Sequence, residues 1–279
     1  MCSWQTVQSL ISQLATSLEY LELQRCEFLP PSQLQLPSFP CLQELRHHQG
    51  YIRTTFPDQN HLNELLRLGS RVTHLHVTGH FRNEPVTACP TSLQYLVTSS
   101  WMLSEHVFGT EPFPRLVHLT VVGFEYADIA DPSSFISDHF PRITSLDLST
   151  LWRLRDRAMV MARSQHNVQA LKLVIYTQDW IMDEEVVPKD QLHHAMLPAG
   201  LQTLKLEVFQ SHYELERGAT RCSRWIFDHV IPSMTHLGGF ALKSISLSVS
   251  QPKSRSGERE RVLSRQWDKA LNGDWQRLE

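Results

Sequence analysis

One pattern of apolar residues recurs along the whole chain and constrains the fold more than any other feature. In it the second apolar residue follows three positions after the first, and the third follows two positions after the second. The stretch FPRITSLDLST shows it, with Ile143, Leu146 and Leu148 behind a Phe-Pro pair. An amphipathic helix would space such residues by three and four, and a half-buried strand by two throughout. The spacing begins at nine positions, which are Leu18, Leu42, Val72, Leu93, Leu116, Ile143, Val168, Leu201 and Leu242.

Each copy is too small to bury its own apolar residues. The last two alternate along a short strand and face inward, and the first turns the chain into that strand. Neighbouring copies can cover one another, and most intervals between them fall in or near the range of leucine-rich repeats. The alternative, an ordinary parallel α/β sheet with coincidental leucines, does not explain nine copies. The predicted fold is therefore α/β, a horseshoe solenoid of irregular leucine-rich repeats with a parallel concave sheet and convex helices.

A Phe-Pro pair stands two or three residues before three of the nine starts. The pairs are Phe39-Pro40, Phe113-Pro114 and Phe140-Pro141. Proline has no backbone N–H to donate and disfavours helix in the residue before it. We therefore expect each pair to end the outer segment where the chain turns back toward the strand.

The segments between the strands mostly have helical periodicity. Helices are expected at residues 4–14 and 62–68, and near 133–139, 153–163, 189–197 and 221–230. The predicted organisation is an N-terminal capping helix in residues 1–17, about nine irregular repeats in 18–250, and a charged linker with a C-terminal capping helix in 251–279. The last helix, near Val262 to Trp275, would cover the open end of the final repeat.

Composition limits the function classes. A net charge of -3 over 279 residues gives no electrostatic footprint for nucleic acid or an anionic membrane, so neither is expected as a partner. Five cysteines without a C-x-x-C pair suit a reduced compartment, and we expect the cytoplasm or nucleus. The sequence has no signal peptide pattern and no apolar run long enough to span a membrane. It also lacks phosphate-binding glycine loops, G-x-S-x-G and H-E-x-x-H, so neither an enzyme nor a cofactor is predicted.

The copies of FPxLxxLxL resemble the irregular leucine-rich repeats of F-box proteins, especially the many fungal ones, over about residues 18–250. In that family the F-box helices dock onto an adaptor of a cullin-type ubiquitin ligase, and the repeats select the substrate. The F-box would precede the first repeat, where this chain has only Met1 to Ser17. Either the F-box has been lost or trimmed, or the protein has no ligase role. A cullin-ligase adaptor is expected as a partner only if an F-box exists outside this chain.

A second departure from regular repeats lies three residues after the last leucine. Regular repeats place Asn or Cys there to hydrogen-bond the turn, and only Cys26 fits. The other residues at this position are His80, Trp101, Phe124, Leu151, Tyr176 and Phe209. Aromatic packing is therefore expected to replace the hydrogen-bonded ladder.

The residues flanking the inward leucines are expected on the concave face. Those of the first five repeats are rich in aromatic and imidazole groups, and those of the last four are small or charged. Strands about 4.8 Å apart would join them into one patch, and tyrosine is common among interface hot spots. The predicted protein-binding residues are Tyr20, Glu44, Arg46, His48, His74, His76, Tyr95 and His118.

The stretch HLHVTGH raises the possibility of a metal site, because His74 and His76 share a face and His80 follows. The next imidazole on the same row, His118, would be two strands or about 9.6 Å away, against Zn–N bonds of about 2 Å. We therefore predict no metal ligands, and solvent-facing histidines whose charge change near neutral pH makes binding pH-dependent.

Two function classes remain. The first is a non-catalytic protein-recognition module, either the substrate receptor of an F-box type ubiquitin ligase or a free-standing repeat scaffold. The alternative is a metal- or small-molecule-binding protein that uses the histidine-rich row.

Overall fold

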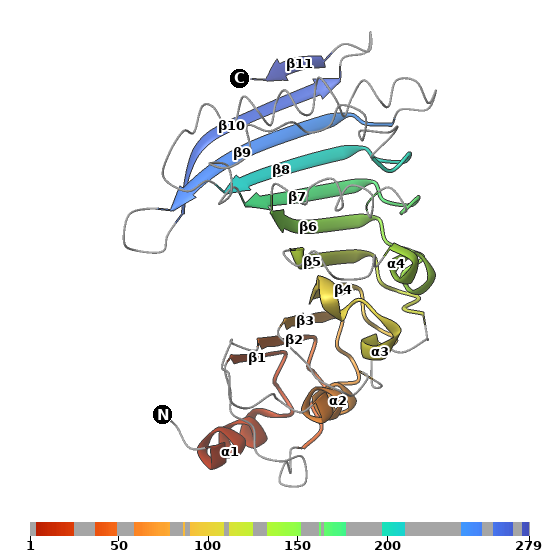
Figure 1. Ribbon diagram of the computed structural model, residues 1–279. Helices are drawn as coiled ribbons and strands as arrows, with labels where there is room; N and C mark the ends of the chain where they lie inside the picture. The colour runs from red at the N-terminus through yellow and green to blue at the C-terminus, as the bar shows by residue number, and fades with distance from the viewer. Residues whose placement is uncertain are drawn as a thin grey trace. The chain divides into compact units, whose positions relative to one another are not determined.

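The computed structural model (Figure 1) consists mainly of an open arrangement of parallel strands with few helices, so the protein is of the α/β class. The structure describes residues 4–24, 37–48, 59–78, 86, 90–108, 112–124, 133–151, 162, 165–176, 197–209, 241–252, 259–269 and 275–278. The chain forms two compact units. Unit 1 comprises Met1–Val122 and Asp138–Arg142, and unit 2 comprises Gly123–Ser137 and Ile143–Glu279.

Five parallel strands, paired in sequence order, form the sheet of unit 1. They are β1 (Tyr20–Gln24), β2 (Glu44–His48), β3 (His74–Thr78), β4 (Tyr95–Ser99) and β5 (His118–Phe124). The described helices of unit 1 are α1 (Trp4–Leu14), α2 (Gln59–Leu68), the 3₁₀ turn η2 (Ser100–Met102) and α3 (Glu105–Phe108). Helix α4 (Ser133–His139) belongs to unit 2 up to Ser137 and to unit 1 from Asp138. The helices predicted near residues 4–14, 62–68 and 133–139 are thus confirmed. Those predicted near 153–163, 189–197 and 221–230 lie outside the described residues, apart from Ala162 and Leu197.

The apolar residues of the spacing form the core. On β3, β4 and β5, the inward residues Leu75, Leu96 and Leu119 are at most 1% exposed, and their neighbours along the strand face the other side. The residues that open these copies, including Val72 and Leu116, are equally buried. The copies of β3 and β5 therefore contribute three apolar side chains each to the core, whereas the third inward residue is His47 on β2 and Thr98 on β4, both buried.

The Phe-Pro pairs form tight turns. The amide of Leu42 donates to the carbonyl oxygen of Phe39 over 3.3 Å, which places Pro40 at the second position of a four-residue turn. Proline suits that position because its fixed φ matches the turn. The Phe39 ring is buried in the core, and its amide donates to the carbonyl of Leu68, the last residue of α2, over 2.9 Å. The predicted role of the pair in returning the chain to the strand is confirmed here.

One carbonyl before each strand anchors the following copy. The carbonyl of Gln43 accepts the amides of Thr73 and His74 at 2.9 and 3.0 Å. The carbonyl of Thr73 in turn accepts those of Gln94 and Tyr95 at 2.9 and 3.0 Å. Each such pair of hydrogen bonds fixes the register between two successive strands. In this register the equivalent side chains of the two strands are neighbours.

Unit 2 contains four further parallel strands in sequence order, followed by two antiparallel ones. The parallel strands are β6 (Ser145–Leu151), β7 (Ala170–Tyr176), β8 (Thr203–Phe209) and β9 (Ser244–Pro252), and the antiparallel ones are β10 (Arg259–Lys269) and β11 (Trp275–Leu278). The rings of Tyr176 and Phe209 stack with their centroids 5.3 Å apart. The expected aromatic packing three residues after the last leucine is confirmed for this pair.

The C-terminal capping helix predicted within residues 251–279 is wrong. Strand β9 extends to Pro252, and β10 pairs with it along almost its whole length, with a register shift between Arg261 and Leu263. An open strand edge offers N–H and C=O groups that need partners, and a helix would leave them unpaired. Valine and tryptophan in RERVLSRQWDK favour a strand, and the side chain of Trp267 is 9% exposed.

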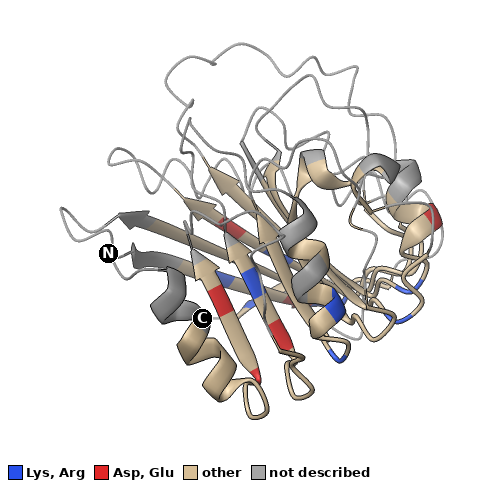
Figure 2. Cartoon of the chain, turned by 90° about the horizontal axis from the view of Figure 1, so that it is seen from below, with Lys and Arg blue, Asp and Glu red and all other residues tan. Residues whose placement is uncertain are grey.

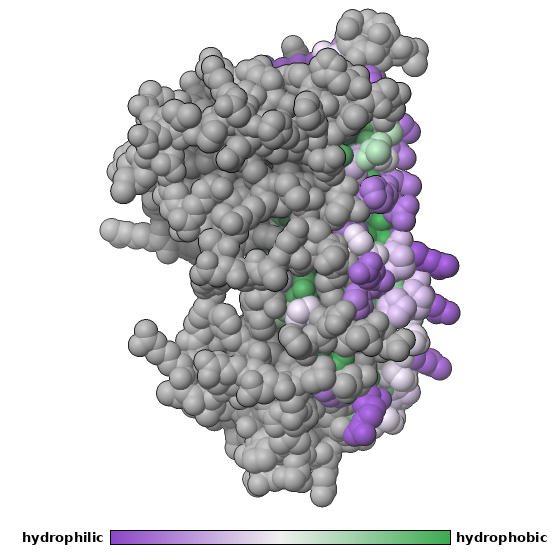
Figure 3. All heavy atoms as spheres, turned by 45° about the vertical axis from the view of Figure 1, so that its right-hand side comes forward, coloured by the Kyte–Doolittle hydropathy of each residue, from purple (hydrophilic) through white to green (hydrophobic). Residues whose placement is uncertain are grey.

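The exposed surface carries few large apolar side chains. Among the described residues, the exposed large hydrophobic side chains are Leu10, Leu14, Tyr20, Tyr95 and Leu278. In the view of Figure 3, hydrophilic side chains prevail where the described residues are visible. The described part of the chain contains no helix with the length and apolar character needed to cross a membrane.

Candidate functional site

One face of β1–β5 carries polar and aromatic side chains in two straight rows, and we call it the row face. The first row, read across the strands, contains Tyr20, Glu44, His74, Tyr95 and His118. The second row contains Glu22, Arg46, His76, Val97 and Thr120. The rows form because side chains alternate along each strand and the parallel register keeps equivalent positions opposite one another.

The β1–β2 end of the row face is a network of opposite charges. The Nε–H of Arg46 donates to Oε1 of Glu44 over 2.7 Å, and its Cζ lies 5.4 Å from the centre of the Tyr20 ring. The hydroxyl of Tyr20 donates to Oε2 of Glu22. Figure 2 shows acidic and basic positions side by side on neighbouring strands. The hydrogen bond with Glu44 raises the pKa of Arg46, so its guanidinium stays charged at every accessible pH.

The β3–β5 end is a stack of rings. The centroids of His74 and Tyr95 are 4.1 Å apart, with only 6° between the ring planes. The His118 ring lies on the next strand, 5.6 Å from the Tyr95 ring and tilted by 34°. Tyr95 is nevertheless 38% exposed. Held by two neighbouring rings, it presents rigid apolar area and a hydroxyl group to solvent.

The hydroxyl of Thr73 contacts the His74 ring. Its oxygen lies 2.9 Å from Nδ1 of His74 and 3.3 Å from the carbonyl oxygen of Gln43. This carbonyl oxygen already accepts the amides of Thr73 and His74, so the hydroxyl can donate to either atom. The contact helps to hold the imidazole beside the Tyr95 ring.

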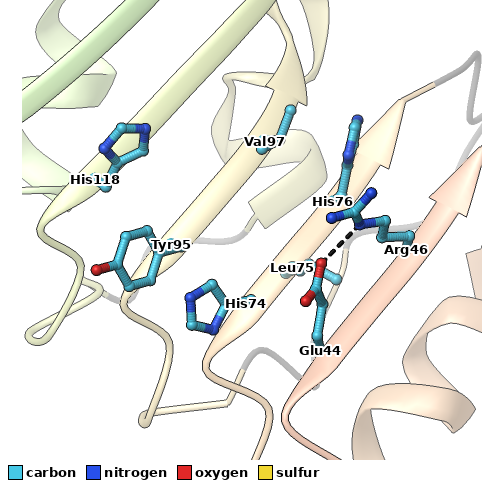
Figure 4. Close-up of a pocket in the computed structure, with 8 residues that line it drawn as sticks. All are labelled: Glu44, Arg46, His74, Leu75, His76, Tyr95, Val97 and His118. Carbon is cyan, nitrogen blue, oxygen red and sulfur yellow. Dashed lines mark hydrogen bonds and ion pairs between the residues drawn. The ribbon is translucent and has the colours of Figure 1, made fainter. Parts of the chain in front are cut away.

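A cavity of about 180 Å³ opens between the two ends of the row face. Figure 4 shows the side chains that line it, which are Glu44, Arg46, His74, Leu75, His76, Tyr95, Val97 and His118. Pockets for small molecules usually measure about 300–1,000 Å³. The cavity is therefore the size of one large amino-acid side chain rather than that of a typical ligand.

The structure brings six of the eight predicted binding residues to this cavity. Of the other two, Tyr20 contacts Arg46 beside the cavity, and His48 belongs to β2, although its side chain lies outside the described residues. Val97 was expected on this face but was not among the predicted binding residues, and the core residue Leu75, which borders the cavity, and Thr73 were not predicted as part of the site. A hydroxyl residue directly before a row histidine is the signal that points to the last of these.

The corresponding face of unit 2 has a different character. Lys172 and Lys205 are opposite each other in register and both bind Glu207, with Nζ–Oε distances of 2.9 Å. The residues around them are mostly serine and threonine, including Thr203, Ser244 and Ser246. The predicted contrast between the two halves of the chain is present around Lys172 and Lys205, although the stacked rings of Tyr176 and Phe209 lie on the same side of β7 and β8.

Partial burial raises the pKa of Glu207, but hydrogen bonds from Lys172 and Lys205 outweigh it and hold the pKa below its ordinary value. A carboxyl group whose pKa is lower in the folded state than in the unfolded state stabilises the protein at pH values above its unfolded-state pKa of about 4.3. This stabilisation is lost as the pH falls through the pKa of the folded state. We expect Glu207→Gln to lower the unfolding free energy by less than about 1 kcal/mol at neutral pH. Urea denaturation of both proteins should give a difference that shrinks in acid; a difference that is constant with pH contradicts this assignment.

The histidines of the row face do not converge on a single point. His118 is two strands away from His74 in the observed register, as predicted. Among the residues that the structure describes, no group of three or more His, Cys, Asp and Glu side chains is placed to hold a metal ion. His80 lies outside this part of the chain.

Comparison of the sequence with family models, with curated proteins and with solved structures gave no match.

Proposed function

We propose that this protein is a non-catalytic recognition module of the leucine-rich repeat type that binds a partner protein in the cytoplasm or nucleus through its row face. The observation that carries the proposal is the exposed stack of His74, Tyr95 and His118 beside a cavity of about 180 Å³. Rigid aromatic anchors next to side-chain-sized cavities are typical of interface hot spots. Nine copies of one spacing, all with strands, support the repeat assignment.

A role as a subunit of a ubiquitin ligase is included in this proposal, and it rests only on the resemblance to F-box proteins. The row face would then select the substrate, and an F-box outside this chain would contact the cullin-ligase adaptor. A free-standing scaffold would use the same face without the adaptor. Small-molecule binding has less support, because the cavity is smaller than usual ligand pockets.

Affinity capture from the source cells tests the proposal. We compare the native chain with a row-face variant that combines Tyr20→Ala, His74→Ala, His76→Ala and Tyr95→Ala. Truncating hot-spot residues typically weakens binding at least tenfold, or about 1.4 kcal/mol. At least one partner protein should therefore be recovered with the native chain and lost with the variant.

The matched control changes four exposed strand residues of unit 2, with Thr203→Ala, Lys205→Ala, Ser264→Ala and Gln266→Ala. Circular dichroism must first show that both variants fold. The control should recover the same partner as the native chain. If the row-face variant also recovers it, the proposed role of the row face is wrong. Recovery of a cullin adaptor with the native chain would support the ligase role.

A further inference from the structure

Arg46 lies in the wall of the cavity with unused hydrogen-bond donors. Its guanidinium carries five N–H groups, of which Nε–H is taken by Glu44. Within the described part of the chain, the two terminal Nη groups make no hydrogen bond. The Tyr20 ring, 5.4 Å from Cζ, supports the guanidinium without accepting a hydrogen bond from it. Four donors with a permanent positive charge are therefore available to a ligand.

The acidic side chains near Arg46 are already engaged. Glu44 accepts the Nε–H of Arg46, and Glu22 accepts the hydroxyl of Tyr20. Glu44 is thus paired with the guanidinium charge, and Glu22 is held by Tyr20 on β1, the strand that does not line the cavity.

The remaining titratable groups around the cavity are imidazoles and one phenol. They come from β3, β4 and β5 and are His74, His76, Tyr95 and His118. Imidazole and phenol groups can both donate hydrogen bonds to an oxygen ligand. His76 is the direct neighbour of Arg46 in the second row. It can therefore contact the same ligand as the guanidinium.

We propose that the cavity binds the carboxylate of an aspartate or glutamate side chain from the partner protein. A guanidinium presents its N–H groups as a planar fork that matches a carboxylate, and such charge-assisted hydrogen bonds are about twice as strong as neutral ones. The cavity volume of about 180 Å³ accommodates one such side chain. This inference rests on the proposed recognition function and adds the chemistry of the partner, which is an acidic segment.

Fluorescence anisotropy with four labelled nonapeptides tests the proposal on the full chain. The peptides have the sequence GSSXXXSSG, with glutamate, glutamine, lysine or phosphoserine at X. We expect the glutamate peptide to bind about tenfold more tightly than the glutamine peptide, and the lysine peptide to bind weakest. The advantage of the glutamate peptide should shrink as the salt concentration rises, because it rests on opposite charges. Equal binding of the glutamate and glutamine peptides, or no binding, overturns the proposal, and a clear preference for phosphoserine reassigns the cavity to phosphate.

Three variants assign the effect to named side chains. Arg46→Gln should lose about tenfold in affinity for the glutamate peptide. The control Arg115→Gln removes an exposed arginine from a turn of the same unit and should change nothing. The double variant His74→Gln with His76→Gln removes two imidazoles from the cavity wall but keeps the guanidinium, so it should lose less affinity than Arg46→Gln. Equal affinity of Arg46→Gln and the native chain rules out the guanidinium as the binding group.

The two proposals can fail separately. If the row-face alanine variant loses its cellular partner and Arg46→Gln retains it, the face is the binding site but the acidic ligand is wrong. If the peptide results hold and the alanine variant retains every partner, the cavity binds carboxylates but the proposed function fails.

Discussion

Replacing Phe113 with alanine is expected to lower the unfolding free energy by about 3–5 kcal/mol. The Phe113 ring is 5% exposed and lies between two other buried rings. Its centroid is 5.9 Å from that of Phe108 and 5.2 Å from that of Phe140, both in edge-on geometry. Truncation removes both edge-on contacts and leaves a cavity that the surrounding turn is not expected to refill.

The backbone at Phe113 increases the expected loss. Its amide donates to the carbonyl of His139 over 2.7 Å, and its carbonyl accepts the amide of Leu116 over 3.3 Å. The ring therefore fixes the turn that directs the chain into β5. Equilibrium denaturation in urea should show a large decrease for Phe113→Ala and a smaller one, within about 1.5 kcal/mol, for the volume-conserving control Phe113→Leu. Similar values for the two variants would show that the ring contacts contribute little.

The strands were predictable from the sequence for a physical reason. The residues in a copy such as Ile143, Leu146 and Leu148 face the core together only if the last two lie on a strand and the first turns into it. The register followed as well, because each copy has the same length from its turn to its strand. For this reason the spacing alone is enough to place His74 and Tyr95 side by side on adjacent strands.

The end of the chain was not predictable from the same pattern. Val262, Gln266 and Trp267 also fit one face of a helix, and the local sequence does not show the open edge of β9. Pairing with that edge satisfies a row of backbone groups and outweighs local helix preference. The sequence of residues 259–269 alone allowed either a helix or a strand, and the contact with β9 decided for the strand.

The site was predictable as a surface but not as a cavity. Alternation places Glu44, Arg46 and His76 on one face, and strand spacing makes them neighbours. The hydrogen bond that draws Nε of Arg46 to Glu44, and so leaves its Nη groups unused, depends on side-chain torsions that the pattern does not encode. The contact between the Thr73 hydroxyl and the His74 ring likewise depends on side-chain torsions.

Replacing Leu206 with alanine in unit 2 is expected to cost about 2–5 kcal/mol of unfolding free energy. Leu206 lies in the middle of β8, its side chain is fully buried, and its register neighbours are Leu173 on β7 and Leu247 on β9. Both neighbours are fully buried as well. The cavity left by the substitution would therefore be enclosed by side chains that are already packed, with little room to collapse around it.

The neighbouring residue provides the control, because Lys205 lies on the opposite, exposed face of the same strand. The Lys205 side chain is 48% exposed, and Lys172 still binds Glu207 without it, so Lys205→Ala should cost less than about 1 kcal/mol. A slip of one residue in the pairing of β8 would exchange the two faces and reverse this order. Urea denaturation of the two variants thus tests the register directly: a larger loss for Lys205→Ala than for Leu206→Ala would overturn the alignment that also places the two rows of unit 1. A larger loss of unfolding free energy for Leu206→Ala would show that the apolar residues of the repeated spacing lie on the buried face of the sheet. The opposite face is then available for binding.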